Sequence, residues 1–281
     1  MKTRTRLQYV FYVTLSALAV CTSACKNENK FKTDEEKEHQ LALEHNIKSI
    51  KEFKTAFLGD VPQKEIRSHE IFFNEDGNKI KEMDYSSETD KGLTITYEYD
   101  KKENLISSKC LNPDNSIVFK TMRNYYADGN RKDLYFYLPD GTYKYRNTAE
   151  YDEKGNMINL KWFWPTGFKA ENKYTYNDTK PMENSEYNPE GVFLYKWVYK
   201  YDKRDNLIEA IQYYPNNSIN SKIDYAYNTK NQLIKQDNII GEFVQNSLIF
   251  EYNNKNLLCT KTEYSTSGII SSKVRFEYEY Y

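Results

Sequence analysis

The stretch that decides the fold spans residues 193–227 and reads FLYKWVYKYDKRDNLIEAIQYYPNNSINSKIDYAY. Aromatic or aliphatic residues alternate with polar ones on either side of Asp202, and again on either side of Pro215. Alternation with a period of two is typical of a half-buried β-strand, and Asp and Pro are typical of the turns between strands. The stretch therefore predicts three antiparallel strands joined by two turns.

The same pattern recurs with a period of about 25 residues. One kind of turn follows an aromatic residue, at Phe73, Tyr99, Tyr126, Tyr151, Tyr176, Tyr201, Tyr227 and Tyr252. Turns of a second kind lie between these and contain Pro113, Pro139, Pro165, Pro189 and Pro215. Two interleaved turns in one period mean two strands per repeat, so residues 68–281 are predicted to form a β-repeat domain of about eight repeats.

Each strand should have one aromatic face and one polar face. Tyr199 and Tyr201, for example, face away from Lys200. In the turn that begins at Asp152, the carboxylate can accept a backbone N–H two residues on, and Gly155 tolerates a positive φ. Because the aromatic face must be hidden, we expect an all-β fold, an extended antiparallel β-hairpin repeat array that curls as a meander.

Residues 33–59 show a different, helical pattern. Apolar residues from Leu43 to Phe57 recur at steps of three and four, Thr33 and Glu36 form a capping box, and Gly59 is a typical stop. We expect one short amphipathic N-terminal α-helix over residues 33–59. Its apolar stripe would cover the exposed first edge of the sheet.

Composition narrows the range of functions. Of the 281 residues, 39% are hydrophobic and 29% are charged, and 27 Tyr and 14 Phe supply much of the apolar area. Such half-polar aromatic content disfavours an enzyme with a thick aliphatic core. The net charge of −1 excludes the strongly basic surface of a nucleic-acid binder.

The N-terminus is predicted to be a signal peptide over residues 1–24, with a cationic start and an apolar run too short to span a membrane. It ends in small residues before Cys25, which resembles the lipobox of bacterial lipoproteins. The resemblance implies lipidation at Cys25 and a polar tether over residues 25–32. The chain would then be exported and membrane-anchored, at the outer membrane or cell surface. The alternatives are an ordinary secreted protein and processing at Cys21.

Three repeats resemble the YD repeats of the Rhs family. They contain Tyr99 with Asp100, Tyr151 with Asp152, and Tyr201 with Asp202, and each Asp is followed four residues later by Asn. The resemblance covers residues 68–281 and implies tyrosine-rich β-hairpins in a short bacterial lipoprotein, loosely associated with carbohydrate and cell-surface binding. About eight units are too few to close a cocoon, so a role in enclosing a toxin is not carried over.

We expect no enzyme activity, no metal and no cofactor. The only His outside the expected helix is His69, and no Ser or Cys motif accompanies it. Residues 74–78 resemble the start of a calcium loop, but they lack the closing Glu of an EF-hand. Cys110 and Cys259 lie about six repeats apart and are expected to be buried, unpaired thiols.

An outer-membrane β-barrel is a second possible architecture, because an even meander with a final strand ending in Tyr also describes such barrels. A barrel of that kind needs an aliphatic band facing the lipid. Here Lys and Glu occupy one face of nearly every strand, and Tyr occupies the other. The pattern disfavours this architecture.

The aromatic residues supply the functional hypothesis. Trp162, Trp164 and Phe168 surround the turn at Pro165, and sugars stack on such rings while amides and carboxylates bind their hydroxyls. We expect a non-enzymatic binding module for a glycan or an envelope protein, with these three residues as ligand-binding candidates. The alternative is a structural or assembly scaffold of the cell envelope, in which the rings form the core.

The anchor can be tested by substitution at Cys25. Cys25→Ser should release the protein from membranes or leave the leader uncut. Cys21→Ser should change little, because only the Cys25 thiol would carry the lipid. Detergent partitioning and N-terminal sequencing measure both effects. Unchanged partitioning of the Cys25 variant would exclude lipidation there.

Overall fold

The computed structural model describes residues 34–85 and 91–281, which contain one α-helix and 19 β-strands. The helix α2 spans Asp34–His45. The strands are β1 (Ile47–Leu58), β2 (Val61–Pro62), β3 (Ile66–Phe73), β4 (Lys79–Tyr85), β5 (Lys91–Tyr99), β6 (Leu105–Leu111), β7 (Ile117–Tyr125), β8 (Arg131–Tyr137), β9 (Tyr143–Tyr151), β10 (Met157–Trp164), β11 (Gly167–Asn177), β12 (Lys180–Tyr187), β13 (Phe193–Tyr201), β14 (Leu207–Tyr213), β15 (Ile219–Tyr227), β16 (Leu233–Ile240), β17 (Phe243–Tyr252), β18 (Leu258–Ser265) and β19 (Ile270–Tyr280).

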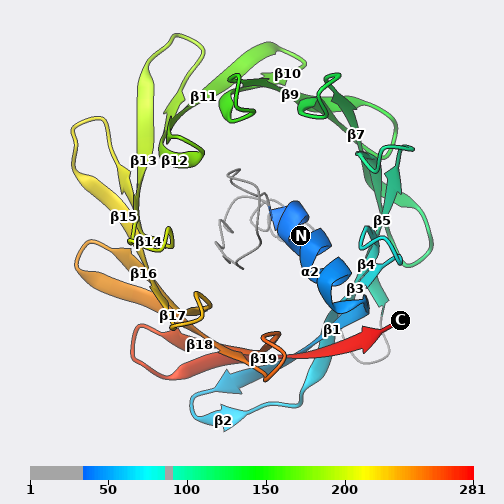
Figure 1. The fold of residues 1–281 in the computed structure, drawn as a ribbon, viewed down its shortest axis with the longest axis vertical. Coiled ribbons are helices and arrows are strands. Elements are labelled where there is room, and N and C mark those ends of the chain that lie inside the picture. The colour runs from blue at the N-terminus through cyan, green and yellow to red at the C-terminus, as the bar shows by residue number, and fades with distance from the viewer. Residues whose placement is uncertain (1–33, 86–90) are drawn as a thin grey trace, which may run out of the picture.

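The strands close into a barrel. From β3 to β19 each strand pairs antiparallel with the next, and β1 pairs with both β3 and β19 (Figure 1). All strands except β2, which pairs only with β1, form a ring of 18. The predicted all-β antiparallel meander is confirmed, but it is a closed barrel rather than an open, curled array.

Register shifts accompany the closure. Every neighbouring pair from β3 to β19 contains one, as between Glu98 and Tyr99 or between Lys200 and Tyr201. A β-bulge bends its strand and increases the local twist. Repeated at each hairpin, the shifts supply curvature that a flat sheet lacks.

The predicted helix over 33–59 is wrong beyond residue 45. The helix ends at His45, Asn46 adopts a φ of 52°, and residues 47–58 form β1. A register shift between Ile47 and Ser49 lets Ile47 and Ile50 join the same buried cluster, so their three-residue spacing imitates a helix. The first sheet edge is therefore covered by a strand, which satisfies its backbone groups as a helix could not.

The aromatic face of the sheet is the inner face of the barrel. The helix α2 lies inside the ring of strands (Figure 1), and its Ala42 packs with Ile50, Ile71 and Phe73. Residues that lie opposite one another on paired antiparallel strands share a face. Followed from strand to strand around the ring, this rule places Tyr199 and Tyr201 on the same inner face. The predicted division into an aromatic and a polar face is confirmed around Tyr199 and Lys200, whereas Phe163 and Phe168 lie on the outer face.

The outer face carries ion pairs across neighbouring strands. Lys109 lies 2.7 Å from Glu98, Lys161 lies 3.1 Å from Glu150, and Lys222 lies 3.2 Å from Glu209. Lys200, between the inner Tyr199 and Tyr201, also pairs with Glu209. The charged residues that disfavour an aliphatic outer band thus form the outside of the barrel.

The turn chemistry follows the prediction. Asp152 accepts the N–H groups of Lys154 and Asn156 at 3.0 and 2.8 Å, and Gly155 has a φ of 78°. The Asn156 side chain donates to the other carboxylate oxygen at 2.9 Å. The same bonds form at Asp100 and Asp202, so in each of these turns the Asp side chain adds to two backbone hydrogen bonds.

A row of tyrosine hydroxyls ties neighbouring hairpins together at the rim that carries these turns. Each hydroxyl donates to a backbone carbonyl about 20 residues earlier, at distances of 2.7 to 3.0 Å. The pairs are Tyr99–Lys79, Tyr125–Leu105, Tyr151–Arg131, Tyr176–Met157, Tyr201–Pro181, Tyr252–Leu233 and Tyr278–Leu258. The third repeat marker is thus Tyr125, one residue before the predicted Tyr126, which occupies the position of the turn Asp.

Cys110 and Cys259 are unpaired, as predicted, but only Cys110 is buried. Residues 1–24 and 25–32, including Cys25, lie outside the described residues, so the signal peptide, tether and lipid anchor stay predictions. In the described ranges, no helix is long and apolar enough to cross a membrane.

The tyrosine row predicts a graded loss of stability. Tyr201→Phe removes only the hydroxyl and should lower the free energy of unfolding by about 1 kcal/mol. Tyr201→Ala also removes the half-buried ring and should cost about 2–4 kcal/mol. Lys200→Ala, on the outer face, should stay within about 0.5 kcal/mol. Urea denaturation measures all three, and equal effects of the two Ala substitutions would contradict the assignment of faces.

Candidate functional site

Four rings form a continuous row on the inner face of β7 to β10. The ring centroids of Phe119 and Phe136 are 4.9 Å apart, those of Phe136 and Tyr145 are 5.0 Å apart, and those of Tyr145 and Trp162 are 5.6 Å apart. The first two pairs are nearly parallel, with interplanar angles of 25° and 15°. Phe136 is stacked on rings from both neighbouring strands, so the row supports Trp162 at its end rather than offering free ring faces.

Beyond Trp162 the inner face becomes polar. The indole N–H of Trp162 donates to the Asn172 side chain at 3.2 Å. The Asn172 amide donates to Asn184 at 3.4 Å and to Glu186 at 3.3 Å. The Tyr195 hydroxyl donates to the same Glu186 carboxylate. Four consecutive strands, β10 to β13, thus place connected hydrogen-bonding groups on the inner wall.

A second Trp flanks this polar group. Trp197 lies opposite Asn184 in the β12–β13 register and packs against the buried Tyr199 cluster. We call Trp162, Asn172, Asn184, Glu186, Tyr195 and Trp197 the amide–aromatic cluster. Of these six residues only Asn172 is buried, and the other five are half-buried. The cluster therefore presents rings, amides and one carboxylate to the inside of the barrel.

Further inner-face polar residues extend from the cluster around the wall. Gln212 accepts hydrogen bonds from Asn220 and Ser221 at 2.6 and 3.2 Å. On later strands, Asn238 donates to Asn246 at 2.7 Å, and Asn246 donates to Glu263 at 2.8 Å. The sequence signal for this site is a set of amide side chains at positions where alternation predicts apolar residues. The Trp residues alone do not reveal it.

An ion network holds α2 to the inner wall. Glu35 makes a two-point contact with Arg123, at 3.0 and 2.9 Å. Lys79 lies 2.8 Å from Glu38 of the helix and 2.5 Å from Glu82. Burial opposes the charge on Glu35, but Arg123 outweighs it and lowers the pKa of that carboxyl.

The network continues to His69, whose ring nitrogens lie 3.6 Å from Glu82 and 3.8 Å from Glu52. Burial would lower the pKa of His69, but these two carboxylates outweigh it and raise the pKa to about 10. Burial likewise would raise the pKa of Glu82, but His69 and Lys79 lower it to about 2. His69 is therefore a charged structural residue at neutral pH rather than a poised general base.

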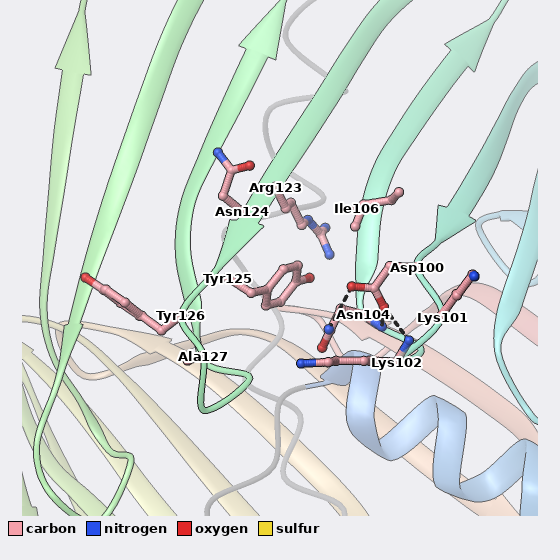
Figure 2. A pocket seen from close by; sticks show the side chains of 10 residues that line it. All are labelled: Asp100, Lys101, Lys102, Asn104, Ile106, Arg123, Asn124, Tyr125, Tyr126 and Ala127. Atoms are coloured by element: carbon pink, nitrogen blue, oxygen red, sulfur yellow. Dashed lines mark hydrogen bonds between the residues drawn. The ribbon is translucent and has the colours of Figure 1, made fainter.

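A cavity of about 600 Å³ lies at the rim near α2, between the β5–β6 turn and the β7–β8 turn (Figure 2). Lys101 and Lys102 line it from the first turn, and Arg123 and Tyr125 line it from β7. Figure 2 shows the Asp100 carboxylate bonded to Asn104 and to the Lys102 backbone, within its own turn. The cavity therefore has a cationic lining.

The structure does not bring the three predicted ligand residues together. Trp162 lies on the inner wall, whereas Phe168 pairs with Phe163, one position along β10, and the register places both on the outer face. Trp164 is 50% exposed beside the β10–β11 turn, with Lys169 5.3 Å from its ring centre. Only Trp162 joins further groups that suit a sugar.

Among the described residues, no group of three or more His, Cys, Asp and Glu side chains has an arrangement that could hold a metal ion. The Asn74 side chain closes the turn over 74–78 by accepting the Asn78 N–H at 2.8 Å. That bond accounts for the calcium-like sequence at this position. Gly77 in the same turn lies against α2, where a Cβ atom would come within 2.9 Å of the His39 carbonyl.

The ion network predicts a specific pH dependence of stability. Because the pKa of His69 is raised from 6.5 to about 10, its contribution is complete below pH 6.5 and is lost as the pH rises through about 10. The difference in Tm between wild type and His69→Gln should therefore be largest near pH 6.5 and shrink toward pH 10. Thermal unfolding across this range measures it, with His45→Gln as control. A difference that does not change with pH would show that His69 is not charged.

No protein-family model matches the sequence, and no curated protein matches it. Among solved structures, the chain is similar to a porin-like protein from Bacteroides uniformis, with 10% identity, a TM-score of 0.46, and coverage of 83% of this chain and 98% of that chain. A porin-like protein from Bacteroides vulgatus has 10% identity, a TM-score of 0.29, and coverage of 84% and 99%. The TcdB2–TccC3–Cdc42 structure has 12% identity and a TM-score of 0.30, and the match covers 75% of this chain but 13% of that one. At these values the likenesses carry no argument about function.

Proposed function

We propose that this protein is an exported, membrane-anchored, non-enzymatic lipoprotein whose barrel binds a glycan on its inner wall, at the amide–aromatic cluster. The observation that carries the proposal is the half-buried state of this cluster inside a barrel of 18 strands. Barrels of about that size are too wide for their own side chains to fill. Inner-wall groups are therefore open to a ligand.

The chemistry of the cluster suits a sugar. Trp162 and Trp197 offer apolar ring surface to the C–H face of a pyranose, while Asn184 and Glu186 can exchange their hydrogen bonds from Asn172 for bonds to its hydroxyls. The hydrogen bonds among these groups hold their rotamers in place before binding. Such preorganisation reduces the entropy lost when a ligand binds.

The charged outer face of the barrel favours contact with water rather than with lipid. In this proposal the barrel is therefore in water, and a lipid on Cys25 anchors it to a membrane. The predicted tether over residues 25–32 can extend at most about 3.6 Å per residue, roughly 29 Å. The barrel would then stay close to the membrane surface. This placement and the lipid rest on the sequence pattern at Cys25.

A scaffold role is the second candidate, and exposed apolar side chains support it. They gather at the rim opposite α2, where Leu58 is 77% exposed, Phe243 74% and Val61 62%. Single exposed apolar residues are common, but several on one rim are typical of a surface that meets another protein. In this alternative the rim docks to an envelope protein and the inner wall has no small ligand.

Binding can be tested with the mature protein and a panel of immobilised neutral polysaccharides. Asn184→Ala should weaken retention about tenfold, since one direct hydrogen bond to the ligand is lost, while changing Tm little because the amide is half-buried. The control is Asn159→Ala, which removes an amide that is bonded to Glu171 at 2.8 Å on the outer face. Equal retention of both variants, or no retention of wild type on any neutral polysaccharide, would contradict glycan binding at this cluster.

A further inference from the structure

The cavity at the α2 rim has cationic groups without matching anions. Lys101 and Lys102 line it, and neither forms an ion pair with a described residue. The one carboxylate in the lining, that of Asp100, accepts three hydrogen bonds from its own turn. Those bonds lower the pKa of Asp100, and Lys102 contributes to the same shift, so Asp100 brings one negative charge to a lining that also holds two lysines and Arg123.

Arg123 is only partly satisfied. Its two terminal nitrogens bind the Glu35 carboxylate at 3.0 and 2.9 Å. Its Nε is buried and forms no hydrogen bond with a described residue, although the Tyr125 hydroxyl lies near the same guanidinium. A guanidinium can donate along two edges, so one edge of Arg123 is used and the other is open.

Positive charge is also in excess next to the cavity. Arg131, on the neighbouring strand β8, donates to the Asn147 side chain at 2.5 Å, and no carboxylate in the described ranges lies within ion-pair distance of it. Burial, together with the nearby Arg123, lowers the pKa of Arg131. Glu35 is thus the one described carboxylate within ion-pair distance of either arginine.

We propose that this cavity binds an anionic substituent, a carboxylate, phosphate or sulfate, carried by the glycan that the inner wall holds. Lys101, Lys102 and the open edge of Arg123 would bind it through charge-assisted hydrogen bonds. A volume of about 600 Å³ lies within the range of small-ligand pockets and admits a substituted sugar unit. The identity of the carrier rests on the proposed glycan function, whereas the anion site itself does not.

Glu35 competes for the site. Its carboxylate already occupies Arg123 from the helix side, as an internal counterpart of the proposed ligand group. Removal of its charge should therefore strengthen anion binding, although it deletes an ion pair. A merely structural ion pair would have no such effect.

The experiment compares dextran with dextran sulfate, and inorganic phosphate with no anion, by calorimetry at low salt with the mature protein. Lys101→Gln together with Lys102→Gln should weaken dextran sulfate binding about tenfold or more, and Glu35→Gln should strengthen it several-fold. The control is Lys203→Gln together with Arg204→Gln. These occupy the same positions in the equivalent turn at Asp202, away from the cavity lining.

The outcomes separate this proposal from the function it builds on. Weaker binding in the Lys101 and Lys102 variant but not in the control, with stronger binding in Glu35→Gln, supports the anion site. Equal losses in both double variants, or no binding of dextran sulfate or phosphate by wild type, overturn it. Binding of phosphate and dextran sulfate with no affinity for any neutral polysaccharide would retain the anion site while contradicting the neutral glycan site.

Discussion

The barrel depends on the double pairing of β1. A meander of antiparallel strands has two exposed edges, and each exposes a row of unpaired N–H and C=O groups. Here both edges bind the same strand, with Ile50 opposite Tyr278 of β19 on one side and opposite Ile71 of β3 on the other. The buried cluster around Ala42, Ile47 and Phe73 then forms where this seam meets α2. The position of the helix inside the ring follows from the position of β1, since only Asn46 separates them.

Much of the wall could be predicted from local chemistry. Alternation placed Tyr199 and Tyr201 opposite Lys200, and Asp152 with Gly155 indicated the turn that the structure contains. These are properties of a few neighbouring residues, which local sequence encodes well. Closure is different because it depends on whether curvature summed over 18 strands brings the two ends together. Residues 47–58 show the difference, since their spacing resembles a helix until β3 and β19 are both present to pair with them.

The candidate site was only partly predictable for the same reason. Trp162 was identified as a conspicuous residue, but Asn172, Asn184 and Glu186 acquire meaning only when four strands align them beside it. An isolated Asn in a strand reads as a surface residue. On an inner wall, hydrogen bonds from neighbouring side chains hold its amide in one orientation, so it acts as a directed donor and acceptor. The cationic cavity likewise combines a turn, a strand and a helix that are distant in sequence.

The seam between β1 and β19 also sets the order in which the parts of the molecule can form. Hairpins such as β13–β14 bring together residues close in the chain, and local contacts of this kind form within microseconds. Ile47, in contrast, must find Tyr280 at the other end of the chain, and contacts of such long range slow folding. Until β19 has formed, β1 lacks one of its two partners. The open ribbon then has two exposed edges, and its sensitivity to aggregation is greatest at that stage.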